Sequence, residues 1–212
     1  MLKMVGSVPY IHRVGENMEK LKTAEAVIVR QKKEWGEILT GFETKNKYEV
    51  LDSSGQQLYW AAEEGSTLAR LFLKVLRPFS IHILSTDGRL AIKTVKPFRF
   101  YFHEMDVFDA GGKFLGRIKR EFSVLTKKFT VEDAQGAAAY DICAPVLHPW
   151  TFKISKNGAE LGEIVKNWSG LGKEAFADAD NFSVKFPREA DAGLKAVLLG
   201  ALFLIDMVYF EK

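Results

Sequence analysis

The chain has 212 residues, 47% of them hydrophobic, which suits a single folded domain with a substantial core and excludes general disorder. Its net charge of +3 is far below that of typical nucleic-acid-binding domains, so no nucleic acid is expected as a partner. The single cysteine, Cys143, excludes an intramolecular disulfide and a cysteine-built zinc site. No secretory signal is visible at the start, and a reducing cytoplasm fits best.

Residues 1–16 show no periodicity and are expected to form a loose arm. In residues 17–33, apolar side chains recur at three- and four-residue spacing, which predicts an amphipathic helix. That helix could pack on the outside of the domain or contact a membrane or partner. The predicted organisation is therefore an N-terminal arm and helix over 1–34, followed by one domain over 35–212.

From residue 35 the pattern changes to short strand-like runs separated by small or polar turns that end in glycine. Glycine supplies positive φ at such turns, so hairpins are predicted. No helix-length pattern lies between the turns, which favours an antiparallel meander over βαβ units. The predicted strands are 47–52, 57–62, 80–85, 90–94, 104–109, 114–119, 128–132, 138–142, 151–155, 160–165 and 181–186, with a further strand near 35–39.

Eleven or twelve strands are more than an open twisted sheet usually holds, and closure removes its exposed edges. We therefore predict a mainly β fold, a closed antiparallel barrel of about twelve strands. A barrel of this size is too wide for strand side chains alone to fill. The only apolar segment able to fill it is the last one, so a buried hydrophobic C-terminal helix is expected over residues 190–210.

Residues 194–210 could instead cross a membrane. Residues 196–210, however, make about 22 Å of helix at roughly 1.5 Å per residue, short of the roughly 30 Å of hydrocarbon in a bilayer. A buried helix is favoured, with single-pass insertion as the alternative. Lys195 and Asp206 are expected to meet the barrel rims or water. The side chains expected to pack against strands are Val197, Leu198, Leu202, Phe203 and Ile205.

Four runs, in order, resemble the phospholipid scramblase family: LTGFETKNKYEVLDSSGQQLYWAAEE, LRPFSIHI, NWSGLGKEAFADADNFSVKFP and KAVLLGALFLID. The resemblance covers most of residues 35–211. It implies a tubby-like fold, a twelve-stranded barrel around a hydrophobic C-terminal helix. It also implies calcium-stimulated, ATP-independent, bidirectional movement of phospholipids between leaflets. A lipid- or phosphoinositide-binding or membrane-tethering module without translocation is the alternative.

Animal members of this family carry palmitoylated cysteine clusters, whereas residues 97–106 here read PFRFYFHEMD, with aromatics where the cysteines would be expected. The aromatic residues could form an interfacial loop among lipid headgroups. A strand with Phe98, Phe100 and Phe102 facing the core is the favoured interpretation.

The resemblance also maps a calcium site onto residues 178–189. Its candidate ligands are Asp178, Asp180, Asn181 and Glu189, so weakly bound Ca²⁺ is the expected cofactor. The segment lacks the oxygen at position five and the glycine at position six of an EF-hand loop. A strand entered through a solvated acidic turn is the competing interpretation.

Basic residues recur along three of the predicted strands and the segment that follows one of them. If these strands are neighbours, the cations form a patch for anionic phospholipid headgroups; solvated strand edges are the alternative. The basic cluster includes Lys127 and Lys128, and the candidate headgroup ligands are Lys93, Lys96, Arg99, Arg117, Lys119 and Arg120. The expected partner is an anionic phospholipid membrane, and the protein is expected in the cytoplasm, at the cytoplasmic face of that membrane. The histidines show no catalytic or metal-ligand spacing, so an enzyme is not expected.

Overall fold

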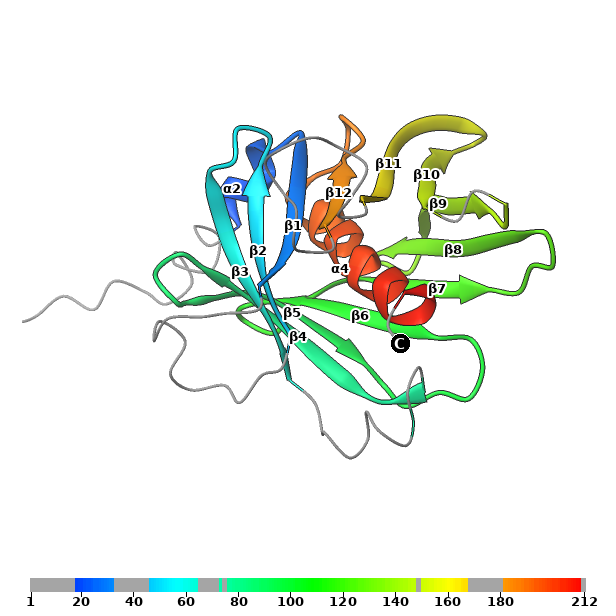
Figure 1. Cartoon of the computed structure of the whole chain (residues 1–212), viewed down its shortest axis with the longest axis horizontal. Helices are drawn as coiled ribbons and strands as arrows, with labels where there is room; N and C mark the ends of the chain where they lie inside the picture. Colours follow the sequence, from blue (N-terminus) through cyan, green and yellow to red (C-terminus); the bar gives the residue numbers. More distant parts are fainter. Residues whose placement is uncertain are drawn as a thin grey trace, which may run out of the picture.

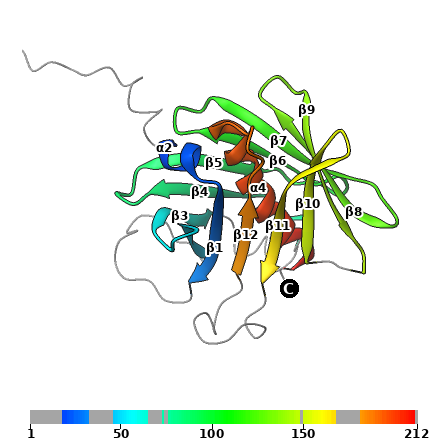
Figure 2. The same ribbon diagram turned by 90° about the horizontal axis from the view of Figure 1, so that it is seen from above.

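The computed structural model describes residues 18–32, 46–64, 73, 76–147, 150–167 and 181–210. In these ranges the chain forms a closed barrel of twelve antiparallel strands around one long helix (Figures 1 and 2). Strands adjacent in sequence pair with each other, and the first pairs with the last to close the barrel. The predicted barrel with an enclosed C-terminal helix is confirmed.

A short helix, α2 (Glu19–Thr23), precedes the strands. The strands are β1 (Ala26–Lys32), β2 (Lys47–Asp52), β3 (Gln57–Glu64), β4 (Phe79–Ser85), β5 (Leu90–Lys96), β6 (Glu104–Asp109), β7 (Phe114–Glu121), β8 (Thr126–Asp133), β9 (Ala138–Pro145), β10 (Thr151–Lys156), β11 (Ala159–Asn167) and β12 (Asn181–Lys185). From β2 onward, the predicted bounds differ from these by at most three residues.

The helix predicted over 17–33 is wrong beyond its first turns. β1 lies in its second half and pairs with both β2 and β12, so the barrel begins at Ala26 and not at residue 35. Val27 and Val29 are buried and alternate with partly exposed neighbours. Their β-branched side chains fit a strand better than a helix, and tertiary pairing overrides the helical spacing. The strand predicted near 35–39 lies outside the described residues.

The two ends of the barrel differ in their connections. At one end, which we call the turn end, tight turns join β2–β3, β4–β5, β6–β7, β8–β9 and β10–β11. Their glycines have φ between 81° and 84°, as the predicted hairpins require. At the other, the loop end, residues 97–103 connect β5 to β6, residues 122–125 connect β7 to β8, and residues 146–150 connect β9 to β10.

Helix α4 (Ala192–Tyr209) runs through the barrel from the turn end to the loop end (Figure 1). Asp191 caps its N-terminus by accepting a hydrogen bond from the Leu194 amide at 2.8 Å. Leu198 and Leu202 are 0% and 1% exposed, and the other side chains predicted to pack on strands are equally enclosed. By length and composition α4 could cross a membrane, yet 67% of it is buried inside the barrel. The predicted burial is confirmed.

Lys195 and Asp206 meet the two barrel rims, as predicted. At the turn end, the Lys195 ammonium donates hydrogen bonds to the carbonyl oxygens of Lys22 and Ala24, at 2.8 and 2.7 Å. These bonds satisfy a nearly buried cation and hold the segment after α2 against the helix. At the loop end, Asp206 forms an ion pair with Lys166 at 3.5 Å.

Two glycines let α4 approach the strands closely. Gly116 on β7 has a φ of 152°, and a Cβ there would lie 2.3 Å from the Glu132 carbonyl oxygen and 2.8 Å from Val197 Cγ2. On the helix itself, a Cβ at Gly200 would lie 3.0 Å from Val107 Cγ2. The first position admits no side chain unless the adjacent strand or the helix shifts.

We expect Gly116→Ala to lower the free energy of unfolding by about 2–4 kcal/mol, because it combines overpacking with backbone strain. Gly136→Asn is the control, since Gly136 faces open space and asparagine tolerates its left-handed backbone. Urea unfolding of both variants measures the difference. An equal loss in the two variants would contradict the proposed close approach of α4 to β7.

Candidate functional site

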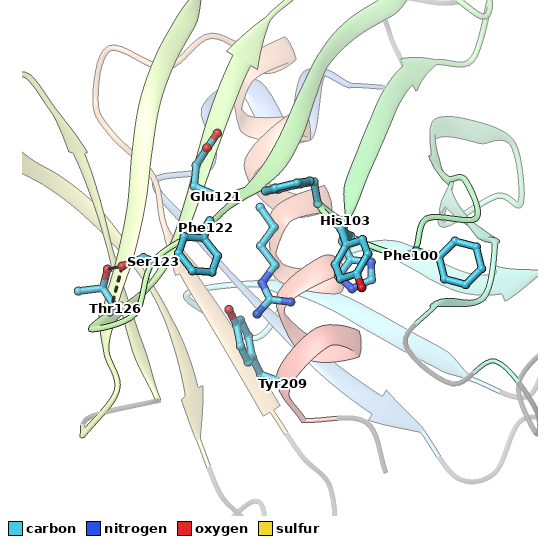
Figure 3. A pocket seen from close by; sticks show the side chains of 10 residues that line it. Phe100, His103, Glu121, Phe122, Ser123, Thr126 and Tyr209 are labelled. Carbon is cyan, nitrogen blue, oxygen red and sulfur yellow. Dashed lines mark hydrogen bonds between the residues drawn. The ribbon is translucent and has the colours of Figure 1, made fainter.

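A hollow of about 230 Å³ opens at the loop end, beside the C-terminus of α4 (Figure 3). It is lined from the β5–β6 loop, from β7 with its following loop, from the start of β8, and from α4. The lining residues are Phe100, Tyr101, Phe102, His103, Arg120, Glu121, Phe122, Ser123, Thr126 and Tyr209. The hollow therefore combines aromatic rings with one guanidinium, one carboxylate, one imidazole and four hydroxyl groups, two of them phenolic.

The strand predicted over the aromatic run is wrong, because residues 97–103 form a loop and Phe98, Phe100 and Phe102 are exposed. Pro97 follows β5 directly and has no N–H to donate to a strand neighbour, which favours ending the strand there. Tyr101 is 80% exposed. The other interpretation drawn from the sequence, an exposed aromatic loop, agrees with this geometry.

Cations from three strands surround the aromatic end of α4. Lys127 on β8 places its ammonium 4.2 Å from the centre of the Tyr209 ring, and the Arg120 guanidinium on β7 lies 5.3 Å from it. Lys166 on β11 lies 4.6 Å from the Phe210 ring centre. Cation–π attraction and the negative end of the helix dipole both favour this arrangement.

Sequence reasoning placed Lys127 among the basic residues of a headgroup patch but missed Lys166. Lys166 is a lysine near the loop end of β11, and only the barrel closure brings it to the end of α4. The sequence feature that could have indicated this cluster is the Tyr209–Phe210 pair at the end of an apolar helix, because its aromatic rings offer faces to cations.

His103 lines the hollow and is 3% exposed, and its Nδ1 has no hydrogen-bond partner among the described residues. Burial, together with the charges of Lys96 and Arg120, lowers the pKa of His103 to about 4. The imidazole is therefore neutral at pH 7. The unpartnered Nδ1 is itself buried, so this nitrogen lies enclosed by protein atoms behind the hollow.

The six predicted headgroup cations do not form one patch. Lys96 is fully buried and donates to the Arg77 and Pro97 carbonyl oxygens, at 2.9 and 3.3 Å, so it is not at the surface. Burial, with the charge of Arg77, lowers its pKa to about 8. Arg120 is the only one of the six that lines the hollow.

The remaining four cations lie outside the hollow. Lys93 is half-buried on β5, and three others are paired with carboxylates: Arg99 with Glu104, Arg117 with Asp106, and Lys119 with Glu132. The outer wall over β6, β7 and β8 thus alternates in sign. Such cross-strand pairs stabilise a sheet but leave little net positive charge for an anionic surface.

Of the four candidate calcium ligands, Asp178 and Asp180 lie outside the described residues. Asn181 begins β12 at the loop end, and β12 carries the chain about 13 Å at roughly 3.3 Å per residue before Glu189 follows at the turn end. Glu189 there accepts a hydrogen bond of 3.5 Å from the Tyr140 hydroxyl. Asn181 and Glu189 therefore do not fit one calcium ion. No three His, Cys, Asp or Glu side chains gather as a metal site within the described ranges.

We expect His103 to make the fold acid-sensitive. Its pKa is about 4 in the folded protein, against the usual 6.5 of a histidine in an unfolded chain, so the unfolded chain binds more protons between these pH values. The free energy of unfolding is therefore unaffected by protonation of His103 above pH 6.5. It falls by up to about 3 kcal/mol as the pH drops from 6.5 towards 4. Urea unfolding of the protein and of His103→Gln at pH 7 and pH 4.5 measures this loss, because the variant has no imidazole to protonate. An equal loss of unfolding free energy in the two proteins would contradict the prediction.

Comparison with known proteins gives a family match. The Scramblase family model matches residues 4–212. Rat phospholipid scramblase 1 is 33% identical over 209 residues, which cover 92% of this chain and 62% of the relative. Bovine phospholipid scramblase 2 is 33% identical over 208 residues, covering 92% and 71%. The chain thus spans a little under two thirds of the rat protein.

Among solved structures, a protein from Arabidopsis thaliana matches with a TM-score of 0.47 and 12% identity, over 89% of this chain and 97% of that one. A similarity this weak gives no support to the fold assignment, which rests on the strand pairing described above. The family resemblance drawn from four sequence runs is confirmed by the family model and the curated relatives. Since the match extends over residues 4–212, the chain belongs to the Scramblase family.

Proposed function

We propose that this protein acts on phospholipid membranes and moves phospholipids between leaflets in both directions without ATP. The observation that carries this proposal is the family match over nearly the whole chain, whose curated relatives are named phospholipid scramblases. The matched region is what the chain shares with these longer relatives. The proposed activity therefore belongs to the barrel with its enclosed helix.

The enclosed helix bears on how such movement could occur. Side chains around α4, including Leu198 and Leu202, pack inside the barrel, so releasing the helix into a bilayer would expose the inner faces of the strands. Asp206, which would line a polar path beside a spanning helix, is engaged by Lys166. We therefore propose that the barrel acts from the membrane surface with α4 in place, at the cytoplasmic face, where anionic lipids are enriched.

The same enclosure favours a second candidate, a lipid-binding or membrane-tethering module without translocation. The hollow at the loop end supports it, because Arg120 presents a guanidinium beside the neutral His103 ring. A guanidinium suits the phosphate of a phospholipid headgroup. In either proposal, stimulation by calcium would depend on the acidic sequence that contains Asp178 and Asp180.

One assay separates the two candidates. Purified protein is reconstituted in vesicles that contain phosphatidylserine and a dye-labelled phospholipid, and a membrane-impermeant reductant then bleaches the outer leaflet. We expect bleaching to extend to inner-leaflet dye without ATP, in vesicles that stay sealed to a soluble dye. Parallel samples with calcium and with chelator test its requirement. Empty vesicles are the baseline.

Co-sedimentation with the same vesicles identifies the alternative. Binding without loss of inner-leaflet dye would support the tethering module and reject translocation, and absence of both would contradict both candidates. Arg120→Gln should weaken binding about fivefold, near 1 kcal/mol for one cation at an anionic surface. Lys113→Gln, the same charge change at the turn end, should leave binding unaltered.

A further inference from the structure

Within the described ranges, the exposed large hydrophobic side chains gather in one region of the molecule. In the described part of the chain, every one of them lies on the three loops at the loop end. They are Phe98, Phe100, Tyr101 and Phe102 on the first loop, Phe122, Val124 and Leu125 on the second, and Val146, Leu147 and Trp150 on the third. Leu147 is 88% exposed and Leu125 is 81% exposed, so these are protruding tips and not the edges of the core.

The turn end is different in composition. Its turns read SSGQ, TDGR, AGGK, AQGA and NG, and none of them exposes a large hydrophobic side chain. Asp52, Asp109 and Asp133 accept backbone hydrogen bonds within their turns. The apolar exposure is therefore specific to one end of the barrel, and clustered exposure of this kind marks an interaction surface.

The three loops are neighbours around the rim. They follow one another as β5–β6, β7–β8 and β9–β10 in a meander in which each strand pairs with the next. In Figure 3, Phe122 on one loop and Phe100 on another lie on either side of the hollow, above Tyr209 of α4. Together the loops and the helix end form one continuous surface, which we call the apolar rim.

The charged residues at the apolar rim indicate which kind of partner it binds. The loops, residues 97–103, 122–125 and 146–150, contain no aspartate or glutamate, and the charge of their Arg99 is balanced by Glu104 at the start of β6. Arg120 and Lys127 lie at their base, against the Tyr209 ring. Aromatic side chains beside cations suit the boundary between headgroups and acyl chains of an anionic bilayer. A second copy docked symmetrically on this rim would instead bring like charges together.

We propose that the three loops of the apolar rim insert into the headgroup region of an anionic phospholipid bilayer. The barrel then stands on the membrane by its loop end, with the C-terminal end of α4 directed at the bilayer and the turn end facing away. This inference rests on the proposed function only in taking phospholipid as the partner. It needs no translocation.

Single cysteines test the orientation. In a Cys143→Ser background, an environment-sensitive dye is attached to Tyr101→Cys, Leu125→Cys or Leu147→Cys, with Ser54→Cys and Gln135→Cys at the turn end as controls. On adding vesicles of phosphatidylcholine and phosphatidylserine, we expect a blue shift and quenching by spin-labelled lipid at the three loop positions. The two control positions should not respond.

Substitution tests the energetics. Leu125→Ser with Leu147→Ser should weaken partitioning into these vesicles at least about tenfold, because two exposed leucines lose their burial in lipid. Both side chains are exposed, so circular dichroism and thermal unfolding should match the parent. The matched control, Gln135→Ser with Ser54→Ala at the turn end, should partition like the parent.

The outcomes separate this inference from the proposed function. Lipid exchange or vesicle binding with silent loop labels would overturn end-on insertion and leave the proposed function standing. A loop response without lipid exchange would support insertion and count against translocation. A blue shift that grows with protein concentration in the absence of vesicles would assign the rim to a second copy and overturn the inference.

Discussion

The structure depends on the enclosure of α4 by the barrel. A barrel of twelve strands needs a filler, and an apolar helix of 18 residues needs a surface that shields it from water. Each therefore provides what the other lacks. Gly116 permits the close approach on β7, and Lys195 holds the segment that precedes β1 over the start of the helix.

The enclosed helix also gives the molecule two unlike ends. Its N-terminus lies among tight polar turns, and its C-terminus lies among cations and aromatic rings. Arg120, Lys127 and Lys166 are held there by ring faces and by Asp206, so the loop end carries positive charge close to apolar side chains. In this account a helix composed like a membrane span acts as a core, and membrane contact falls to the loops around its end.

The hairpins and the buried helix could be predicted from the sequence, because both depend on local signals: glycine turns, alternation and one apolar segment. β1 could not, since Val27 and Ile28 continue a helical spacing from Ala24 while Val27 and Val29 fit a strand alternation, and only pairing with β2 and β12 decides between them. The prediction of one headgroup patch was wrong for a related reason. Whether Lys96 points inwards and whether Arg117 meets Asp106 are set by register, which composition does not encode.

The most direct test of this account asks whether α4 stays enclosed in the free protein. Cells are lysed without detergent at high salt, which weakens attraction to anionic lipid, and the cleared supernatant is purified and examined by sedimentation velocity. The account predicts a monodisperse, folded protein that remains in solution without detergent. Protein that stays with the membrane pellet at high salt and is released only by detergent, even when Leu125→Ser and Leu147→Ser weaken the loop contact, would contradict it, since α4 and not the loops would then hold it in the bilayer.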